Sequence, residues 1–222
     1  MVRRRVGVRA WPGIPGKSSW YGGEVAGFDS KQALRRQLRQ HRRALDVDQR
    51  RSEEQAVHAH LIDWLAAARW PALGAYVAMA SELAVDALLA TYWDAGRQVF
   101  LPRVEPDGVL GWYSVPGAGH LRAGYRGISE PDPHRCEPAT LAAIDVLLVP
   151  GVGFTRSGMR LGQGGGFYDR VLADYVGCAV APVFRCQLVP KIPSEVHDRP
   201  VQGVVNADGW CGEPPAIARV DG

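Results

Sequence analysis

Cysteine is scarce in this sequence and follows no metal-binding pattern. No Cys-x-x-Cys pair occurs, and no histidine stands at zinc-ligand spacing from a cysteine. Structural zinc sites need such spacings, and small secreted folds held by disulfides carry cysteine more densely. We therefore expect reduced thiols, mostly structural, at the four positions Cys136, Cys178, Cys186 and Cys211.

Long hydrophobic runs are also missing. No apolar run approaches the roughly 20 residues that a membrane helix needs. Residues 1–5 resemble the basic start of an export signal, but the glycine- and proline-rich segment 10–16 is not the apolar stretch that such a signal requires. We therefore expect a cytoplasmic protein that is not exported and has no membrane partner.

The chain has no large excess of positive or negative charge. The chain has 26 lysines and arginines against 23 acidic residues, a formal net charge of +3, which does not by itself predict a nucleic-acid partner. Arginines cluster between Arg35 and Arg51. Such a basic helix either faces solvent or binds phosphates, and composition leaves both alternatives open.

Length and composition are typical of a globular chain. Hydrophobic residues make up 46% and charged residues 22% of the 222 positions, so the chain needs neither a disulfide nor a structural metal to fold. Residues 1–28 are rich in glycine, proline and arginine and show no amphipathic period. We expect a disordered extension there, followed by a single α/β domain over residues 29–222.

Apolar strands that alternate with amphipathic helices predict the fold class. Helices are expected after a cap at Asp29 and Ser30, from Ser52, over residues 85–95 and over residues 167–175. Strands are expected over residues 73–80, 97–104, 110–115, 144–149 and 178–184, and a long functional loop over residues 116–140. This order indicates a three-layer sandwich, in which helices cover both faces of a mostly parallel sheet.

The segment Pro150–Arg170 carries the strongest chemical signal. Four of the five residues from Gly162 to Gly166 are glycines, which expose backbone N–H groups ahead of a helix N-terminus. Arg160 offers a bidentate guanidinium to a phosphate, and Asp169 could hold Mg²⁺ against bound phosphates. A flexible loop before a capped helix is the plain alternative, but the flanking charges favour an anion cradle.

Two better-known glycine motifs fit this segment poorly. The dinucleotide motif G-x-G-x-x-G would need a glycine at Phe167, and the Walker A motif would need a lysine that the segment lacks.

The same residues resemble the 5-formyltetrahydrofolate cyclo-ligases, also called methenyltetrahydrofolate synthetases. The motif of that family reads approximately P-G-x-x-F-D-x-x-G-x-R-L-G-x-G-x-G-Y-Y-D-R, and the resemblance runs from about Lys31 to Gly209. It implies an enzyme that uses ATP and Mg²⁺, and we expect the protein to be a monomer. The implied reaction converts 5-formyltetrahydrofolate to 5,10-methenyltetrahydrofolate and releases ADP and phosphate.

The resemblance also implies a role for individual residues. Lys31 and Arg35 would contact ATP and act in catalysis with Arg160, while Asp169 and Asp198 would hold Mg²⁺. The implied ATP-binding set is Lys31, Arg35, Arg160, Leu161, Gly162, Gln163, Gly164, Gly165, Gly166, Phe167 and Tyr168. The implied substrate-binding set is Val77, Glu82, Gln163, Gly164, Gly165, Gly166 and Phe167.

Some positions depart from the family pattern. Thr155 replaces the usual aspartate, Ala84 and Val85 stand where Asp-Thr is frequent, and Arg185 stands where an acidic residue is typical. These departures concern folate affinity and turnover more than nucleotide binding. The alternative is therefore a folate- or nucleotide-binding regulatory protein of the same fold with little or no turnover, and a weaker one is a phosphotransferase for another small amide.

Overall fold

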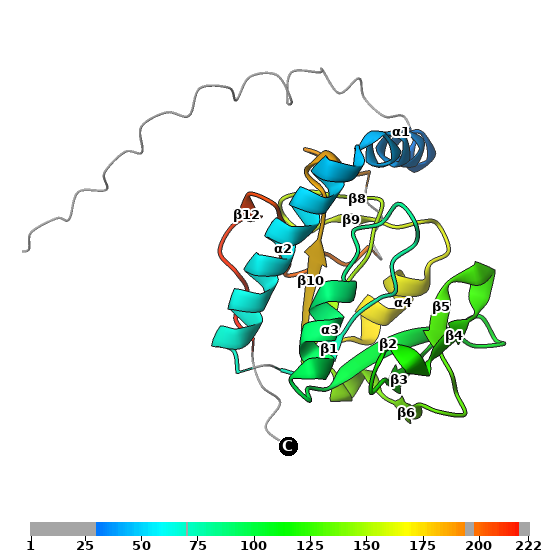
Figure 1. Cartoon of the computed structure of the whole chain (residues 1–222). Helices are drawn as coiled ribbons and strands as arrows, with labels where there is room; N and C mark the ends of the chain where they lie inside the picture. The colour runs from blue at the N-terminus through cyan, green and yellow to red at the C-terminus, as the bar shows by residue number, and fades with distance from the viewer. Residues whose placement is uncertain (1–29, 70, 194–197, 218–222) are drawn as a thin grey trace, which may run out of the picture.

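The computed structural model describes residues 30–69, 71–193 and 198–217 (Figure 1). The extension predicted over residues 1–28 lies outside the described residues. Ser30 caps the first helix as predicted, because its side-chain oxygen accepts a hydrogen bond from the Ala33 N–H at 3.2 Å.

The described helices follow the apolar periods of the sequence. They are α1 (Lys31–Ala44), α2 (Val47–Ala67), α3 (Asp86–Asp94) and α4 (Phe167–Asp174). Short 3₁₀ turns occur at η1 (Ala118–His120), η2 (Tyr125–Gly127), η3 (Leu141–Ala143) and η4 (Arg185–Gln187). The chain leaves α3 through Gly96, whose φ of 63° suits glycine after a helix.

An eight-stranded sheet in the order β12-β11-β10-β7-β1-β2-β3-β6 occupies the centre. Its strands are β1 (Leu73–Gly74), β2 (Val99–Val104), β3 (Leu110–Ser114), β6 (Glu137–Ala139), β7 (Val146–Leu148), β10 (Cys178–Pro182), β11 (Gly203–Asn206) and β12 (Gly209–Trp210). The neighbours from β11 to β2 pair in parallel, while β12, β3 and β6 pair antiparallel at the edges. The mostly parallel sheet is therefore confirmed.

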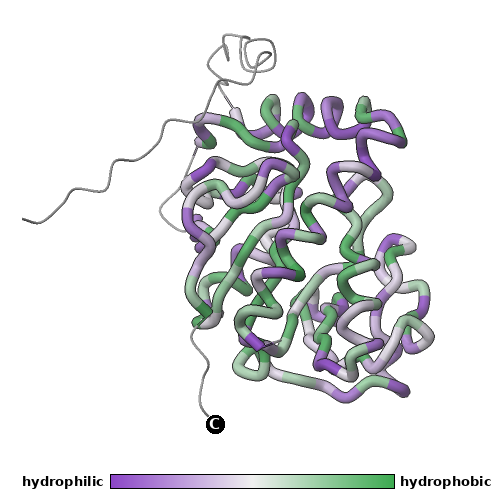
Figure 2. Tube along the Cα trace, turned by 60° about the vertical axis from the view of Figure 1, so that its left-hand side comes forward, coloured by the Kyte–Doolittle hydropathy of each residue, from purple (hydrophilic) through white to green (hydrophobic). Residues whose placement is uncertain are grey.

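Helices cover both faces of the sheet, which confirms the predicted three layers (Figure 1). Side chains of α2 and α3 pack with Val146 and Leu148 of β7, whereas α4 packs with Leu147 between them. Alternate residues of a strand point to opposite faces, so one short strand contributes to both cores. Figure 2 shows the hydrophobic stretches gathered in the interior, with many hydrophilic turns along α1.

Two predicted elements have different bounds in the structure. The second helix begins at Val47, earlier than the predicted Ser52, because the Asp46 side chain caps it by accepting from the Gln49 N–H at 2.8 Å. The strand predicted over residues 73–80 was wrong beyond Gly74. The residues directly after Gly74 are buried by side-chain packing and do not pair as a strand. Hydrophobic periodicity alone cannot distinguish a buried loop of this kind from a buried strand.

The predicted loop over residues 116–140 contains more regular structure than expected. Strands β4 (Leu121–Ala123) and β5 (Ser129–Pro131) form an antiparallel hairpin, and β6 extends the main sheet. The hairpin is tied to β2 by an ion pair at 3.5 Å between Arg103 and the buried Glu130. No helix within the described ranges has the length and apolar character needed to cross a membrane.

Candidate active site

Helix α1 lies on the glycine-rich segment and makes its own small core there. Leu34 and Leu38 are buried against Val152, Leu161 and Ile192. The segment between these contacts includes a second short hairpin of β8 (Gly153–Phe154) and β9 (Arg160–Leu161). This packing fixes the rotation of α1, so its basic face points to the glycines that follow β9.

Two arginines one helical turn apart hold the backbone of that segment. The Nε of Arg35 donates a hydrogen bond to the Gly162 carbonyl oxygen at 2.8 Å. Arg39 donates to the side-chain oxygen of Gln163 at 2.7 Å and to its carbonyl oxygen at 3.2 Å. Of the two alternatives for the basic helix, the structure thus supports the one in which this face is engaged with the proposed phosphate cradle.

Glycine is required in the cradle for two separate reasons. A side chain at Gly162 would place its Cβ 2.6 Å from Nη1 of Arg160, so any residue other than glycine would displace that guanidinium. Gly164 and Gly166 have φ values of 105° and 69°, which other residues rarely adopt. Gly166 precedes α4 and has no side chain to cap it, so the first N–H groups of the helix are available to an anion.

The predicted phosphate-binding and metal-binding residues are paired with one another. Arg160, with 8% of its surface exposed, donates a hydrogen bond from Nη2 to the carboxylate of Asp169. Lys31 forms the corresponding ion pair with Asp198 at 2.9 Å, with side chains 21% and 11% exposed. Each carboxylate proposed for Mg²⁺ is therefore balanced by a cation proposed for ATP.

The donor chemistry of this site fits Mg²⁺. Within the described residues no group of three or more His, Cys, Asp or Glu side chains is placed to hold a metal. Mg²⁺ is usually held by one or two carboxylates together with substrate phosphates and water, so the predicted ligands Asp169 and Asp198 would be enough to hold it.

The folate-binding residue predicted from the sequence lies next to the cradle. Glu82 is 6% exposed, and its two carboxylate oxygens accept hydrogen bonds from the Met79 N–H at 3.1 Å and from Nε2 of Gln163 at 3.0 Å. Val77 precedes it on the same loop and is half-buried against the main core. The loop after β1 is thereby joined to the glycine segment by a direct side-chain contact.

The two aromatic residues at the start of α4 have different surroundings. The Phe167 ring lies 6.2 Å from the Tyr125 ring of η2 and 5.3 Å from the Arg170 guanidinium. The Tyr168 hydroxyl is buried and has no hydrogen-bond partner among the described residues. Burial, followed by the charge of Glu82, raises the pKa of Tyr168, so the hydroxyl stays protonated. The Tyr125 contact could not be expected from the sequence, because the hairpin that supplies it was not predicted.

Thr155 stabilises the turn between β8 and β9 with its side-chain oxygen, as an aspartate at this position would. Its hydroxyl accepts a hydrogen bond from the Met159 N–H at 3.0 Å and contacts the Ser157 hydroxyl at 2.9 Å. A side-chain oxygen at this position stabilises the turn whether it belongs to a carboxylate or a hydroxyl.

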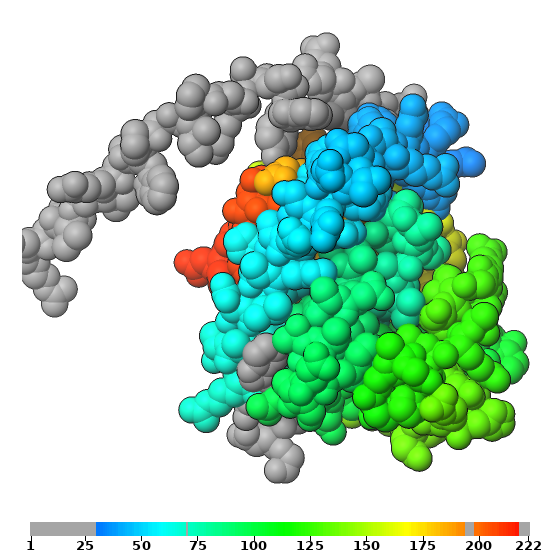
Figure 3. Space-filling view, in the orientation of Figure 1, coloured from blue at the N-terminus to red at the C-terminus, as the bar shows by residue number. Residues whose placement is uncertain are grey.

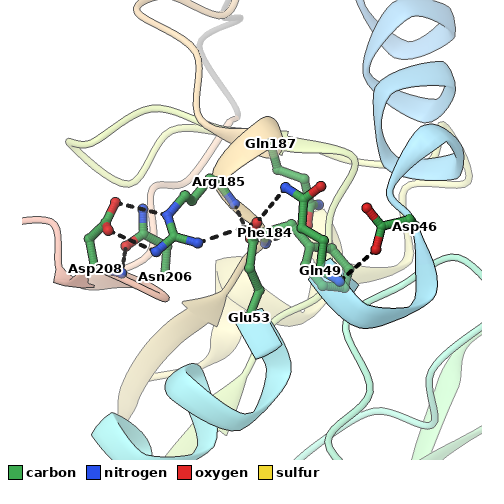
Figure 4. A network of polar contacts seen from close by, with 8 residues as sticks. All are labelled: Asp46, Gln49, Glu53, Phe184, Arg185, Gln187, Asn206 and Asp208. Carbon is green, nitrogen blue, oxygen red and sulfur yellow. Dashed lines mark hydrogen bonds and ion pairs between the residues drawn. The ribbon is translucent and has the colours of Figure 1, made fainter. Parts of the chain in front are cut away.

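Arg185 belongs to a polar network that joins η4, α2 and the turn after β11 (Figure 4). Its backbone N–H donates to Glu53 at 2.9 Å, and its guanidinium pairs with Glu53 at 3.4 Å. Asp208 accepts two further bonds from Nε and Nη2, at 3.1 and 2.9 Å. Glu53 is 2% exposed, so Arg185 neutralises a buried carboxylate.

The remaining departures lie at the start of α3. The Ala84 N–H donates to Glu54 at 3.2 Å, its carbonyl oxygen contacts His58 at 2.7 Å, and Val85 is buried in the core. These contacts connect α3 to α2 and are part of the scaffold.

Comparison with known proteins identifies the family of the chain. The family model of the 5-formyltetrahydrofolate cyclo-ligases matches residues 28–207. The chain belongs to the 5-formyltetrahydrofolate cyclo-ligase family. Members of that family include a Mycolicibacterium smegmatis protein that is 36% identical, over 76% of this chain and 89% of its own, and an Escherichia coli protein that is 32% identical, over 76% and 95%. Both are named 5-formyltetrahydrofolate cyclo-ligase.

Solved structures of the cyclo-ligase family have the same fold. The 5,10-methenyltetrahydrofolate synthetase of Aquifex aeolicus superposes with a TM-score of 0.73 at 25% identity, covering 86% of this chain and 97% of that one. The enzyme from Mycoplasma pneumoniae gives 0.66 at 21% identity, covering 80% and 99%. At 21% identity, the similarity to the Mycoplasma pneumoniae enzyme is evidence for a shared fold only.

Proposed function

We propose that this chain catalyses the ATP-dependent ring closure of 5-formyltetrahydrofolate to 5,10-methenyltetrahydrofolate, with release of ADP and phosphate. The observation that carries the proposal is the hydrogen bond between Gln163 and Glu82, because it joins the loop proposed for the folate to the cradle proposed for ATP. Arg35 reaches the same cradle from α1. Reaction between two bound substrates requires this kind of proximity.

The chemistry is a phosphoryl transfer followed by ring closure. The formyl oxygen attacks the γ-phosphorus of ATP, ADP leaves, and an imidate phosphate forms at N5. N10 then attacks the imidate carbon and loses its proton, and phosphate departs with the former formyl oxygen. In such steps the protein acts by positioning the reactants and by stabilising charge. No residue of the chain needs to act as a covalent nucleophile.

The roles that we assign follow from the contacts of each group. Arg160 and Lys31 are the cations that would bind phosphate oxygens, and Arg35 supports the cradle by donating to the Gly162 carbonyl. When bound, Mg²⁺ neutralises the phosphate charge that develops during transfer. Asp169 and Asp198 would hold it.

The two ion pairs suggest how the site receives ATP. Arg160 would exchange Asp169 for a phosphate, and Lys31 would exchange Asp198 for another. Each carboxylate would then bind the metal instead of that cation. The buried Arg160 and the half-buried Lys31 would keep a partner in both states, which limits the free energy needed to hold them in place.

The test is an assay of the purified protein with ATP, Mg²⁺ and 5-formyltetrahydrofolate that follows the near-UV absorbance of the methenyl product. ADP is expected to form only when the folate is present, in step with product. Tight folate binding without product at saturating ATP and Mg²⁺ would instead favour a regulatory protein. A monomeric state and a cytoplasmic location remain predictions, which light scattering and cell fractionation check.

A further inference from the structure

A β-hairpin projects beside the start of α4. It consists of β4 and β5, joined by a tip at residues 124–127, and Figure 3 shows it as a projection from the body of the molecule, while Figure 1 shows α4 beside it. The base of the hairpin is fixed to β2, because the buried Glu130 accepts a hydrogen bond from the Val104 N–H at 3.2 Å and pairs with Arg103 at 3.5 Å.

The tip is joined to α4 through a pair of aromatic rings. The Tyr125 ring lies 6.2 Å from the Phe167 ring at an angle of 70°, an edge-to-face arrangement. Within the described residues, the hydrogen bonds of residues 124–128 all join residues of the hairpin itself, and neither ring belongs to one of the three apolar cores. The tip can therefore separate from α4 when this ring contact breaks.

Phe167 is the fixed half of the pair. Its ring packs on the cradle, because a Cβ at Gly165 would lie 3.0 Å from it. The Arg170 guanidinium lies 5.3 Å from the centre of the same ring and donates a hydrogen bond to the Gly108 carbonyl oxygen at 3.0 Å. The two rings thus form an apolar cover that extends outward from the cradle, and Tyr125 is the half that can move.

The proposed reaction needs a cover of this kind. The imidate phosphate can be attacked by N10, which closes the ring, or by water at its phosphorus. In the second case the bond between phosphorus and the formyl oxygen breaks, its electron pair returns to that oxygen, and 5-formyltetrahydrofolate is regenerated. The phosphate carries the oxygen of the water and passes one proton to solvent, so ATP is hydrolysed without product. Closed active sites prevent such side reactions by excluding water.

We propose that Tyr125 is a positioning residue of the reaction, whose ring holds the hairpin tip against Phe167 and keeps water from the imidate phosphate. The inference rests on the proposed function. The tip opens to admit the folate and to release the product, and it is closed between these events. An aromatic pair shifts an equilibrium by about twofold to tenfold, so this contact favours the closed tip and still lets it open in each turnover.

The experiment compares wild type with Tyr125→Ala, which removes the ring, and Tyr125→Phe, which keeps it. Arg122→Ala is the matched control, because Arg122 is exposed in β4 of the same hairpin and pairs with Asp132 at 3.8 Å. Tyr125 is 40% exposed, so its replacement should leave the protein folded, which thermal melts check.

Turnover is measured with ATP, Mg²⁺ and 5-formyltetrahydrofolate in water labelled with a heavy oxygen isotope. Phosphate released by ring closure takes the formyl oxygen, whereas phosphate released by hydrolysis takes the label. Tyr125→Ala should raise the folate-dependent labelled fraction about twofold to tenfold over wild type, because the open tip is populated more by that factor. Tyr125→Phe and Arg122→Ala should leave the labelled fraction unchanged.

Limited proteolysis follows the tip without turnover. Arg126 is exposed, and its guanidinium lies 5.1 Å from the centre of the Tyr125 ring. Trypsin cleavage after Arg126 in the native protein tracks the population of the open tip. The cleavage should be about twofold to tenfold faster in Tyr125→Ala than in Tyr125→Phe.

The other outcomes overturn the inference in distinguishable ways. Equal labelled fractions and equal cleavage rates in Tyr125→Ala and Tyr125→Phe would refute the ring contact as the closure while leaving the proposed function intact. Faster cleavage, or a higher KM for the folate, without extra labelled phosphate would refute the exclusion of water. If wild type makes no product, the proposed function fails, and the trypsin measurement then tests the closed tip separately, where equal rates would refute it.

Discussion

Replacing Asp169 with asparagine separates a metal ligand from a structural cap. Asparagine keeps the size of the side chain but loses the charge that pairs with Arg160. Breaking a fully buried pair costs about 3–5 kcal/mol, and an exposed pair contributes about 0.2–1 kcal/mol. The Arg160 side chain is 5% exposed and that of Asp169 36%, so the free energy of unfolding should fall by an intermediate amount, about 1–2 kcal/mol. For a chain of this size that lowers Tm by about 2–8 °C.

The effect on activity should be much larger than the effect on stability. Loss of one preorganised group that stabilises transition-state charge costs roughly 10²–10³ in rate, or about 2.7–4 kcal/mol. We expect kcat of Asp169→Asn to fall by that factor and the Mg²⁺ concentration for half-maximal rate to rise, with folate binding nearly unchanged. Arg160→Lys, which keeps the charge but loses the bidentate fork, should also fold and lose activity.

Asp174→Asn is the matched control for these measurements, because Asp174 is exposed at the other end of α4. Thermal melts and Mg²⁺ titrations of the steady-state rate distinguish the two roles. If Asp169→Asn unfolds the protein while folded Arg160→Lys works normally, the pair is a structural cap and the assignment of the phosphate and metal site is wrong.

Three further substitutions test the site and its support. Gly162→Ala should displace Arg160, because its Cβ would lie 2.6 Å from Nη1, and steady-state kinetics should show a higher KM for ATP and a lower kcat in a folded protein. Tyr168→Phe removes a buried hydroxyl without a described partner, so urea denaturation should show stability unchanged or raised by up to about 1 kcal/mol; a clear loss would reveal a partner. Arg185→Ala leaves Glu53 buried without its cation and should lower stability by about 1–3 kcal/mol, whereas a changed KM for folate would contradict its assignment to the scaffold.

The basic helix α1 shows which features a periodic sequence pattern can predict and which it cannot. Apolar residues at Leu34 and Leu38 predict the helix and its buried side, because side chains three and four residues apart share a face. The same spacing places Lys31 and Arg35 on a common face. The sequence leaves open whether that face meets solvent or phosphate. The docking of α1 on Val152 and Leu161 turns Arg35 onto the Gly162 carbonyl, so the structure shows that this face meets the glycine-rich segment, and phosphate binding there stays a prediction.

The sequence by itself determined the parallel α/β class and the family, and it predicted the cradle, because each rests on local signals. Apolar runs between helices, glycines ahead of a helix and the long motif over Pro150–Arg170 are all legible without knowledge of neighbours in space. Tertiary structure alone decided which charged groups form ion pairs with one another. Arg160 pairs with Asp169 and Lys31 with Asp198, because burial and the distance between segments remote in the sequence set these partners.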